Sequence, residues 1–184
     1  LKAMNFKKGS EIIAPCLNFG TAIGSIMLCN LKPILVDCET ETLQIDVKKI
    51  EKKITKKTKA IVPVHFTGYM TDMRTLMPLS KKYNIPIVED ACQSILANIN
   101  HKNAGTWGIA GSFSLHPLKN VNVWSDGGVI TTNNYSLYKK LLLLRNHGLV
   151  DRDTVKICGY NSRLDTFQAV VGNWLLPSAK SISN

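Results

Sequence analysis

The sequence predicts an α/β fold, a three-layer αβα sandwich in which helices cover both faces of a mostly parallel, mixed sheet. Two observations support this prediction. Short runs such as Pro33–Val36 and Ile85–Val88 are apolar throughout, as expected of strands that are buried on both faces. Amphipathic stretches of helix length separate such runs as far as Asp90, and this alternation is typical of parallel βαβ units.

The elements before Asp90 follow the alternation without a break. We expect strands at Glu11–Ala14, Pro33–Val36, Ala60–Val64 and Ile85–Val88. We expect helices at Thr21–Cys29 with Thr21 near its N-cap, after an Asp46 cap, and at about Asp72–Tyr83. The helix after Asp46 places Val47, Ile50 and Ile54 on its inward stripe.

The pattern changes beyond Asp90. Within and around the stretch Gly111–Thr132, two apolar runs at Ala110–Leu115 and Val129–Thr132 have no helix between them, which predicts an antiparallel pair joined by a short polar turn. Two more helices follow, at Ser136–Arg145 and Leu164–Leu176, and a long polar loop, His147–Asn161, separates them.

Length and charge limit the function classes. A chain of 184 residues is long enough for one domain with a sizeable core. The net charge is +10, and the segment Lys48–Lys59 alone carries seven lysines and one glutamate. This run is either a phosphate or nucleic-acid patch or a solvated helix face. Because it lacks arginine and aromatic residues, we favour the solvated face and expect no nucleic-acid partner.

The cysteines and the apolar segments indicate a cytoplasmic protein. The five cysteines are scattered, odd in number and without a CxxC pair, so we expect reduced thiols and no metal site. The N-terminal residues do not form a signal peptide, and Ile12–Met27 is too short and too polar to span a membrane. The chain begins without methionine and stops soon after a predicted helix, so we expect a fragment of a longer protein, in one domain over residues 1–184.

The candidate site lies where the parallel strands end. Ligands of open α/β sheets bind beyond the carboxyl ends of the strands, which share one edge. Asp90 ends a buried strand at that edge, and Gln93 follows three residues later. Asp90 is either an ordinary capping or turn aspartate or the counter-charge of a bound cation, because a carboxylate at a buried strand end needs such a partner.

Lys119 is the second candidate. No acidic residue lies between Asp90 and Asp126, so this lysine has few charged neighbours in the sequence. It is either a surface lysine on a turn or an amine nucleophile whose pKa is depressed by partial desolvation. Ser112 and Ser114 alternate on the preceding strand, so both hydroxyls point to one face, either bonded to the backbone or directed at a ligand phosphate.

Together these groups match the needs of pyridoxal phosphate. A lysine forms a Schiff base with the cofactor aldehyde, a carboxylate keeps the pyridine nitrogen protonated, and hydroxyl and main-chain N–H groups hold the phosphate. An aromatic residue to stack on the ring is also expected, and Phe19 is available in the first loop at the edge.

The chain resembles the sugar aminotransferases of the DegT/DnrJ/EryC1/StrS family. The resemblance lies in VEDACQS, SFSLHPLKN, SDGGVITTN, LRNHG and GYNSRLDTFQAVVG, all in order, and extends more weakly through PVHFTGYMTDM to EIIAPCLNFGTA. It covers nearly the whole chain and implies the large domain of a type I pyridoxal-phosphate enzyme. It also implies that a Gly-Thr phosphate loop before Leu1 and a C-terminal small domain are missing here.

The resemblance also implies a role for each candidate. Lys119 matches the lysine that bonds to the cofactor, Asp90 the partner of the pyridine nitrogen, Gln93 a glutamine near the ring oxygen, and Ser114 a phosphate ligand. Phe19 falls at the ring-stacking position. Asn161 matches an asparagine that reaches the cofactor phosphate of a neighbouring subunit, which implies a homodimer with shared active sites.

Two departures from the family pattern are visible. The family usually has a histidine soon after the glutamine, but Ile95 and Leu96 follow Ser94 in this chain. The usual Ser-Phe-His is replaced by Ser-Leu-His, ending at His116.

The implied activity is transfer of an amino group from glutamate (or glutamine) to a nucleotide-linked keto-sugar, with pyridoxal phosphate as cofactor. Two alternatives share the fold. Sugar dehydratases replace the lysine by histidine, but here Lys119 is present and His116 lies three residues too early. A non-catalytic regulatory member has no need of the set Asp90, Gln93, Ser114 and Lys119, which is complete in this chain.

Overall fold

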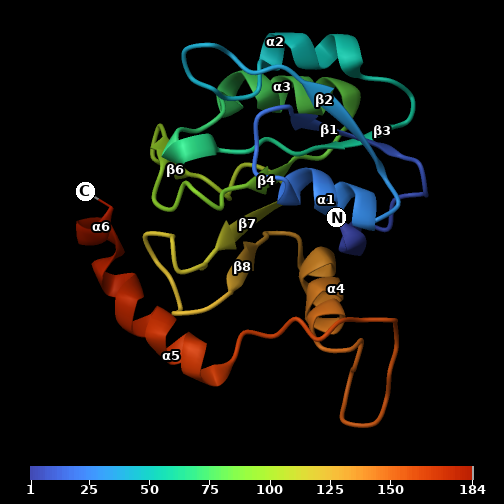
Figure 1. The fold of residues 1–184 in the computed structure, drawn as a ribbon. Coiled ribbons are helices and arrows are strands. Elements are labelled where there is room, and N and C mark those ends of the chain that lie inside the picture. Colours follow the sequence, from blue (N-terminus) through green and yellow to red (C-terminus); the bar gives the residue numbers. More distant parts are fainter. Residues whose placement is uncertain (184) are drawn as a thin grey trace.

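The computed structural model describes residues 1–183 and shows a mixed sheet with helices on both faces (Figure 1). The strands of the main sheet are β1 (Glu11–Pro15), β2 (Lys32–Val36), β3 (Thr58–Ile61), β4 (Val88–Asp90), β7 (Ala110–Ser114) and β8 (Gly128–Thr131). Strands β2-β1-β3 are parallel, as are β4 and β7, while β8 runs antiparallel to β7. Parallel bridges from Ile61 to Ile87 and from Val64 to Asp90 join β3 to β4, giving the order β2-β1-β3-β4-β7-β8.

The remaining elements surround this sheet. The α-helices are α1 (Thr21–Leu28), α2 (Val47–Ile50), α3 (Met73–Tyr83), α4 (Tyr135–Arg145), α5 (Thr166–Leu175) and α6 (Ala179–Ile182). The 3₁₀ turns are η1 (Lys2–Met4), η2 (Glu51–Lys53), η3 (Phe66–Gly68) and η4 (Leu176–Ser178). A short hairpin of two-residue strands, β5 (Asn98–Ile99) and β6 (Lys102–Asn103), was not predicted from the sequence. No helix in residues 1–183 is both long and apolar enough to cross a bilayer.

Strand β1 divides the core into two halves. All of its residues are buried, and successive side chains of a strand point to opposite faces. Ile13 packs with Ile50 of α2 and Leu76 of α3 on one face, whereas Ile12 packs with Ile26 of α1 on the other. Figure 1 shows α2 and α3 on the opposite side of the sheet from α1. The predicted three-layer αβα arrangement is therefore confirmed.

Side-chain caps begin several helices. Asp46 accepts a hydrogen bond from the main chain of α2, and Asp72, Asn134 and Asp165 do the same for α3, α4 and α5. The cap at Asp46 was predicted. Thr21 lies next to the N-cap of α1 as expected; the N-cap itself is Gly20, and no side chain bonds there.

Two predicted strands are shifted along the chain because proline interrupts their ladders. The predicted strand Ala60–Val64 is observed as Thr58–Ile61, and Ile85–Val88 as Val88–Asp90. Pro63 and Pro86 have no N–H to donate, so regular pairing stops at each. Their carbonyl groups still accept hydrogen bonds from Asp90 and Ile61, at 2.9 and 3.0 Å, so the chain stays extended across the gap.

The predicted short turn between β7 and β8 is wrong. The connection is a loop of residues 115–127, which folds back and buries Leu115, Val121 and Val123. These side chains pack with Leu164 and Leu175. The loop is long because its alternating apolar side chains form a small core of their own instead of a tight turn.

The lysine-rich segment is a solvated face, as favoured above, but its helix is shorter than expected. After one turn of α-helix the chain continues as the 3₁₀ turn η2. Val47 and Ile50 are buried while Lys48, Lys49 and the lysines of η2 are exposed. Lys49 pairs with Asp37 at 3.4 Å, so part of the charge is balanced within the chain.

Candidate active site

The carboxyl ends of β1, β2, β3, β4 and β7 lie along one edge of the sheet, because all five strands are parallel to their neighbours. The last residues of these strands and the loops that follow them carry every predicted site residue except Asn161. This edge is where an open α/β sheet binds its ligands.

Asp90 is the last residue of β4, and its position is fixed by main-chain bonds on both sides. Its N–H donates to the Pro63 carbonyl, and its own carbonyl accepts from the N–H of His65, both at 2.9 Å. The carboxylate oxygen Oδ1 accepts from the N–H of Cys92 at 3.1 Å. The side chain is half-buried. The second carboxylate oxygen therefore remains for a cationic partner.

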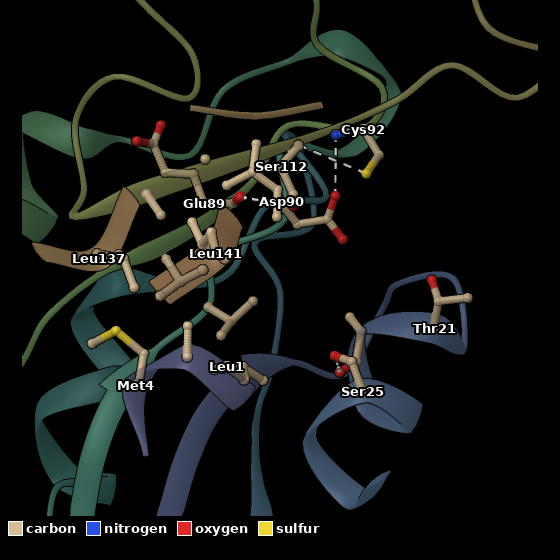
Figure 2. A pocket seen from close by; sticks show the side chains of 17 residues that line it. Leu1, Met4, Thr21, Ser25, Glu89, Asp90, Cys92, Ser112, Leu137 and Leu141 are labelled. Carbon is tan, nitrogen blue, oxygen red and sulfur yellow. Dashed lines mark hydrogen bonds between the residues drawn. The ribbon is translucent and has the colours of Figure 1, made fainter. Parts of the chain in front are cut away.

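A cavity of about 260 Å³ opens beside Asp90. Figure 2 shows Asp90, Cys92 and Ser112 on one side and Thr21 and Ser25 of α1 on the other. Most of the remaining wall is apolar, from η1, α4 and β7. Of the predicted site residues, only Asp90 lines this space, so the cavity covers one end of the site and the edge loops hold the rest.

Lys119 lies in the loop after β7, and β7 pairs in parallel with β4, the strand that ends at Asp90. Burial, reinforced by the neighbouring Asp90 carboxylate, raises the pKa of the Cys92 thiol to about 12, and the positive charge of Lys119 opposes this rise. Both charges therefore act on one thiol. Lys119 is half-buried in the loop after β7, with its N–H bonded to the His116 carbonyl at 2.8 Å. The thiol stays protonated at neutral pH, so it does not compete with Lys119 as a nucleophile.

Ser114 and Ser112 differ in what their hydroxyls do. The Ser114 oxygen accepts from the N–H of His116 at 3.2 Å, so its proton is free to donate to a ligand. The Ser112 hydroxyl instead donates to the Glu89 carbonyl at 3.2 Å, which is the backbone-bonded alternative considered from the sequence. Ser114 is thus the better phosphate ligand of the two.

Gln93, Phe19 and Asn161 occupy separate places. The Gln93 side-chain oxygen accepts from the N–H of Thr67 at 2.7 Å, which ties the loop after β4 to the loop after β3. Phe19 leads into α1 with its ring 73% exposed, available for stacking. Asn161 is exposed and pairs with Asn146 at the end of α4. Among residues 1–183 it has no hydrogen bond to the other predicted site residues.

Comparison with known proteins identifies the family of this chain. The DegT/DnrJ/EryC1/StrS aminotransferase family matches residues 1–184, the whole chain. The chain belongs to this family. Its fold is that of the pyridoxal-phosphate-type aminotransferases in the same family.

The curated relatives include proteins named as regulators and proteins named as enzymes. A pleiotropic regulatory protein of Geobacillus stearothermophilus is 39% identical over 171 residues, which is 93% of this chain and 46% of that protein. The UDP-N-acetyl-3-dehydro-alpha-D-glucosamine 3-aminotransferase of Acidithiobacillus ferrooxidans is 37% identical over 171 residues, again 93% and 46%. The chain spans about half the length of the curated relatives it matches.

Solved structures of the family superimpose closely. DesV of S. venezuelae, in complex with a ketimine intermediate, has a TM-score of 0.94 at 31% identity. The match covers 98% of this chain and 48% of the DesV chain. NtdA of Bacillus subtilis, with bound cofactor PMP, has a TM-score of 0.87 at 34% identity, over 98% and 41%.

The family's cofactor fits the groups at this edge. A carboxylate with a free oxygen, an amine close by, a hydroxyl with a free proton and an exposed aromatic ring are the groups that a protonated pyridine ring with an aldehyde and a phosphate requires. The cavity beside Asp90 adds a mostly apolar wall at one end of the site. The fit therefore rests on the kinds of functional group that these residues provide.

The sequence reasoning missed one charged group, Glu89. Its side chain is fully buried and accepts four hydrogen bonds, from the ring of His65 at 3.0 Å and from the main-chain N–H groups of Gly105, Trp107 and Gly108 at 2.7–2.8 Å. Burial opposes the charge, but the hydrogen bonds from His65, Gly108 and Gly105 outweigh it and hold the pKa of Glu89 below its ordinary value.

This buried network fixes the strand that carries Asp90. His65 accepts from the Thr71 N–H through Nδ1, so its Nε2 carries the proton that Glu89 accepts. His65 also donates its main-chain N–H to the Asp90 carbonyl. The available sequence signal was an acidic residue inside an otherwise apolar strand, next to Asp90, with glycines at 105 and 108.

Proposed function

We propose that the protein is a pyridoxal-phosphate-dependent aminotransferase that moves an amino group from glutamate or glutamine to a nucleotide-linked keto-sugar. The observation that carries the proposal is that Asp90 ends β4 and Lys119 follows the paired strand β7, at the ligand edge of a chain that matches the family throughout. Relatives named as aminotransferases of nucleotide-linked sugars support the substrate class.

Each residue has a distinct task in this proposal. When bound, the cofactor supplies an aldehyde and a protonated ring that withdraws electrons from the reacting carbon. Asp90 pairs with the ring nitrogen, Gln93 faces the ring oxygen, Ser114 donates to the phosphate and Phe19 stacks on the ring. Lys119 would bond to the aldehyde, and its free amine would take up and release the proton of the reacting carbon as general base and acid.

Asn161 belongs to a different task. Asn161 matches the family asparagine that reaches the cofactor phosphate of a neighbouring subunit, and it is exposed here, so we assign it to that role in a homodimer with shared sites. The free thiols are consistent with a cytoplasmic location.

The first experiment tests cofactor binding in the complete protein. We add pyridoxal phosphate and record the visible absorbance band of the covalent adduct for the wild type and for Lys119→Ala. We expect the band in the wild type and its loss in the variant. A wild type without the band refutes the enzyme proposal, and a band unchanged in Lys119→Ala refutes the assignment of the lysine.

A second experiment tests the shared sites. Subunits with Lys119→Ala and subunits with Asn161→Ala are mixed under conditions that allow exchange. If the sites are shared, each mixed dimer has one intact site, so about a quarter of wild-type activity returns with random pairing. A mixture no more active than its two components shows that each subunit is self-sufficient.

A regulatory role without turnover is the second candidate, because one of the relatives is named a pleiotropic regulatory protein. Incubation of the loaded complete protein with L-glutamate or L-glutamine separates the two. Formation of the corresponding 2-oxo acid in an amount equal to the cofactor supports the aminotransferase, and cofactor binding without oxo-acid formation supports the regulatory role.

A further inference from the structure

Two residues of the loop after β7 hold the main chain of Lys119, His116 through its carbonyl and Asn122 through its side chain. His116 accepts at its carbonyl from the N–H of Lys119, and at Nδ1 from the N–H of Leu118 at 3.2 Å. On the other side, the side-chain NH₂ of Asn122 donates to the Lys119 carbonyl at 3.4 Å. The peptide groups of Lys119 are therefore held from both directions.

The other half of the Asn122 carboxamide bonds to Trp124. Its oxygen accepts from the Trp124 N–H at 3.3 Å. Trp124 has a φ of 62°, a conformation that bulky residues seldom adopt without support. The Trp124 ring packs against Phe167 of α5, with ring centroids 6.0 Å apart. One carboxamide thus joins Lys119 to a strained residue that is anchored on a neighbouring helix.

The position of Asn122 is fixed by its neighbours. Val121 and Val123 are 2% and 1% exposed and lie in the small core under the loop. Asn122 between them is half-buried, and its side chain bonds to the main chain of Lys119 and Trp124. Spanning a carbonyl and an N–H takes a group that both donates and accepts, which a carboxamide does and a carboxylate does not.

We propose that Asn122 is a positioning residue for Lys119, fixing the turn from which the lysine side chain reaches the cofactor aldehyde. The inference rests on the proposed function, in which Lys119 bonds to that aldehyde. Asn122 itself touches neither cofactor nor substrate in this role.

Three variants of the complete protein test the proposal. Asn122→Ala removes both hydrogen bonds, whereas Asn122→Asp keeps the acceptor for the Trp124 N–H and loses the donor to the Lys119 carbonyl. Asn120→Ala is the matched control, because Asn120 is exposed, one residue from Lys119, and its side chain bonds only to Ser183 among the residues described.

Two readouts follow the two hydrogen bonds. The first is the rate at which pyridoxal phosphate becomes attached to Lys119, trapped with borohydride and located by mass spectrometry. The second is amide hydrogen exchange at Trp124 in protein without cofactor. We expect trapping to slow roughly fivefold in both Asn122 variants, the effect of one lost hydrogen bond, and to be unchanged in Asn120→Ala. Exchange at Trp124 should accelerate in Asn122→Ala and stay near wild type in Asn122→Asp.

The outcomes separate this inference from the function on which it rests. A wild type that traps no cofactor at Lys119 refutes both. A wild type that traps normally, with both Asn122 variants trapping at the same rate, refutes the positioning role alone. A lower thermal midpoint with unchanged trapping shows a purely structural role and refutes it too. If Asn122→Ala does not fold, Asn122→Asp alone decides, since it retains the bond to Trp124.

Discussion

Replacing Glu89 by glutamine tests how strongly the buried network holds β4. The two carboxylate oxygens divide four donors between them, Trp107 and Gly108 on Oε1 and His65 and Gly105 on Oε2. Glutamine keeps one oxygen and replaces the other by an NH₂ group. Whichever way the amide lies, two buried donors then face a third donor.

The magnitude follows from that count. Each buried donor left without a partner costs about 1–3 kcal/mol, so two of them cost about 2–6 kcal/mol. Such a loss is a large share of the roughly 5–15 kcal/mol that stabilises a typical domain. We therefore expect Glu89→Gln to fold only marginally at 25 °C and to unfold at a much lower urea concentration than the wild type.

The assay is urea unfolding followed by tryptophan fluorescence, with Glu51→Gln as the matched control. Glu51 accepts from Lys82 and Tyr83, both at 2.7 Å, but is exposed, so water replaces the lost partners and little change is expected. If Glu89→Gln is no less stable than Glu51→Gln, the buried donors are not held by the carboxylate and the reasoning is wrong.

The pH dependence of folding stability provides an independent test of the role of Glu89. The folded-state pKa of Glu89 lies below its ordinary value of 4.5, so its contribution to stability is complete above about pH 4.5 and is lost as the pH falls through the folded-state pKa. The difference in unfolding free energy between the wild type and Glu89→Gln should therefore shrink in acid. A difference that grows on acidification would contradict the direction of this pKa shift.

Three further predictions concern separate parts of the fold. In Gly108→Ala the new Cβ would collide with the main chain just before β4, so we expect a loss of about 1–3 kcal/mol in urea unfolding. The control Gly24→Ala, where a Cβ meets open space inside α1, should be neutral or slightly stabilising, and equal effects would count against the packing argument. Asp165→Ala removes the capping box of α5 and should cost about 1 kcal/mol, measured the same way, whereas Asp165→Asn should retain most of it. The Cys92 thiol, with its pKa of about 12, should alkylate with iodoacetamide at pH 8 far more slowly than the exposed Cys158, by mass spectrometry of the folded protein; comparable rates would mean that Cys92 is not shielded as described.

Much of the fold could be predicted from the sequence because burial imposes periodicity. Strands covered on both faces must be apolar at nearly every position, and the wholly buried β1 meets this condition. Pro33–Val36 lies entirely within β2, but this strand stands at the edge of the sheet and only Val36 of it is buried. Caps are local as well, and Asp46 and Asp72 bond to the main chain two residues ahead. The extents of β3 and β4 were misplaced because the ladders depend on which N–H groups a proline removes, and this requires knowledge of the partner strand.

Part of the candidate site could likewise be predicted from the sequence. Asp90 and Lys119 were identifiable from their residue types at strand ends, and the family resemblance supplied roles for Gln93, Ser114, Phe19 and Asn161. What the sequence determined by itself was the set of chemical groups and the edge of the sheet to which they belong.

Only the tertiary structure decided how those groups are held. It brought the charges of Asp90 and Lys119 to bear on one thiol, gave Ser114 a free hydroxyl proton, and revealed the network around Glu89 and the Asn122 bridge. Hydrogen bonds between loops distant in the sequence depend on distances and directions that no local pattern encodes. For that reason the pattern predicts which residues can react, and the folded chain determines where each one is held.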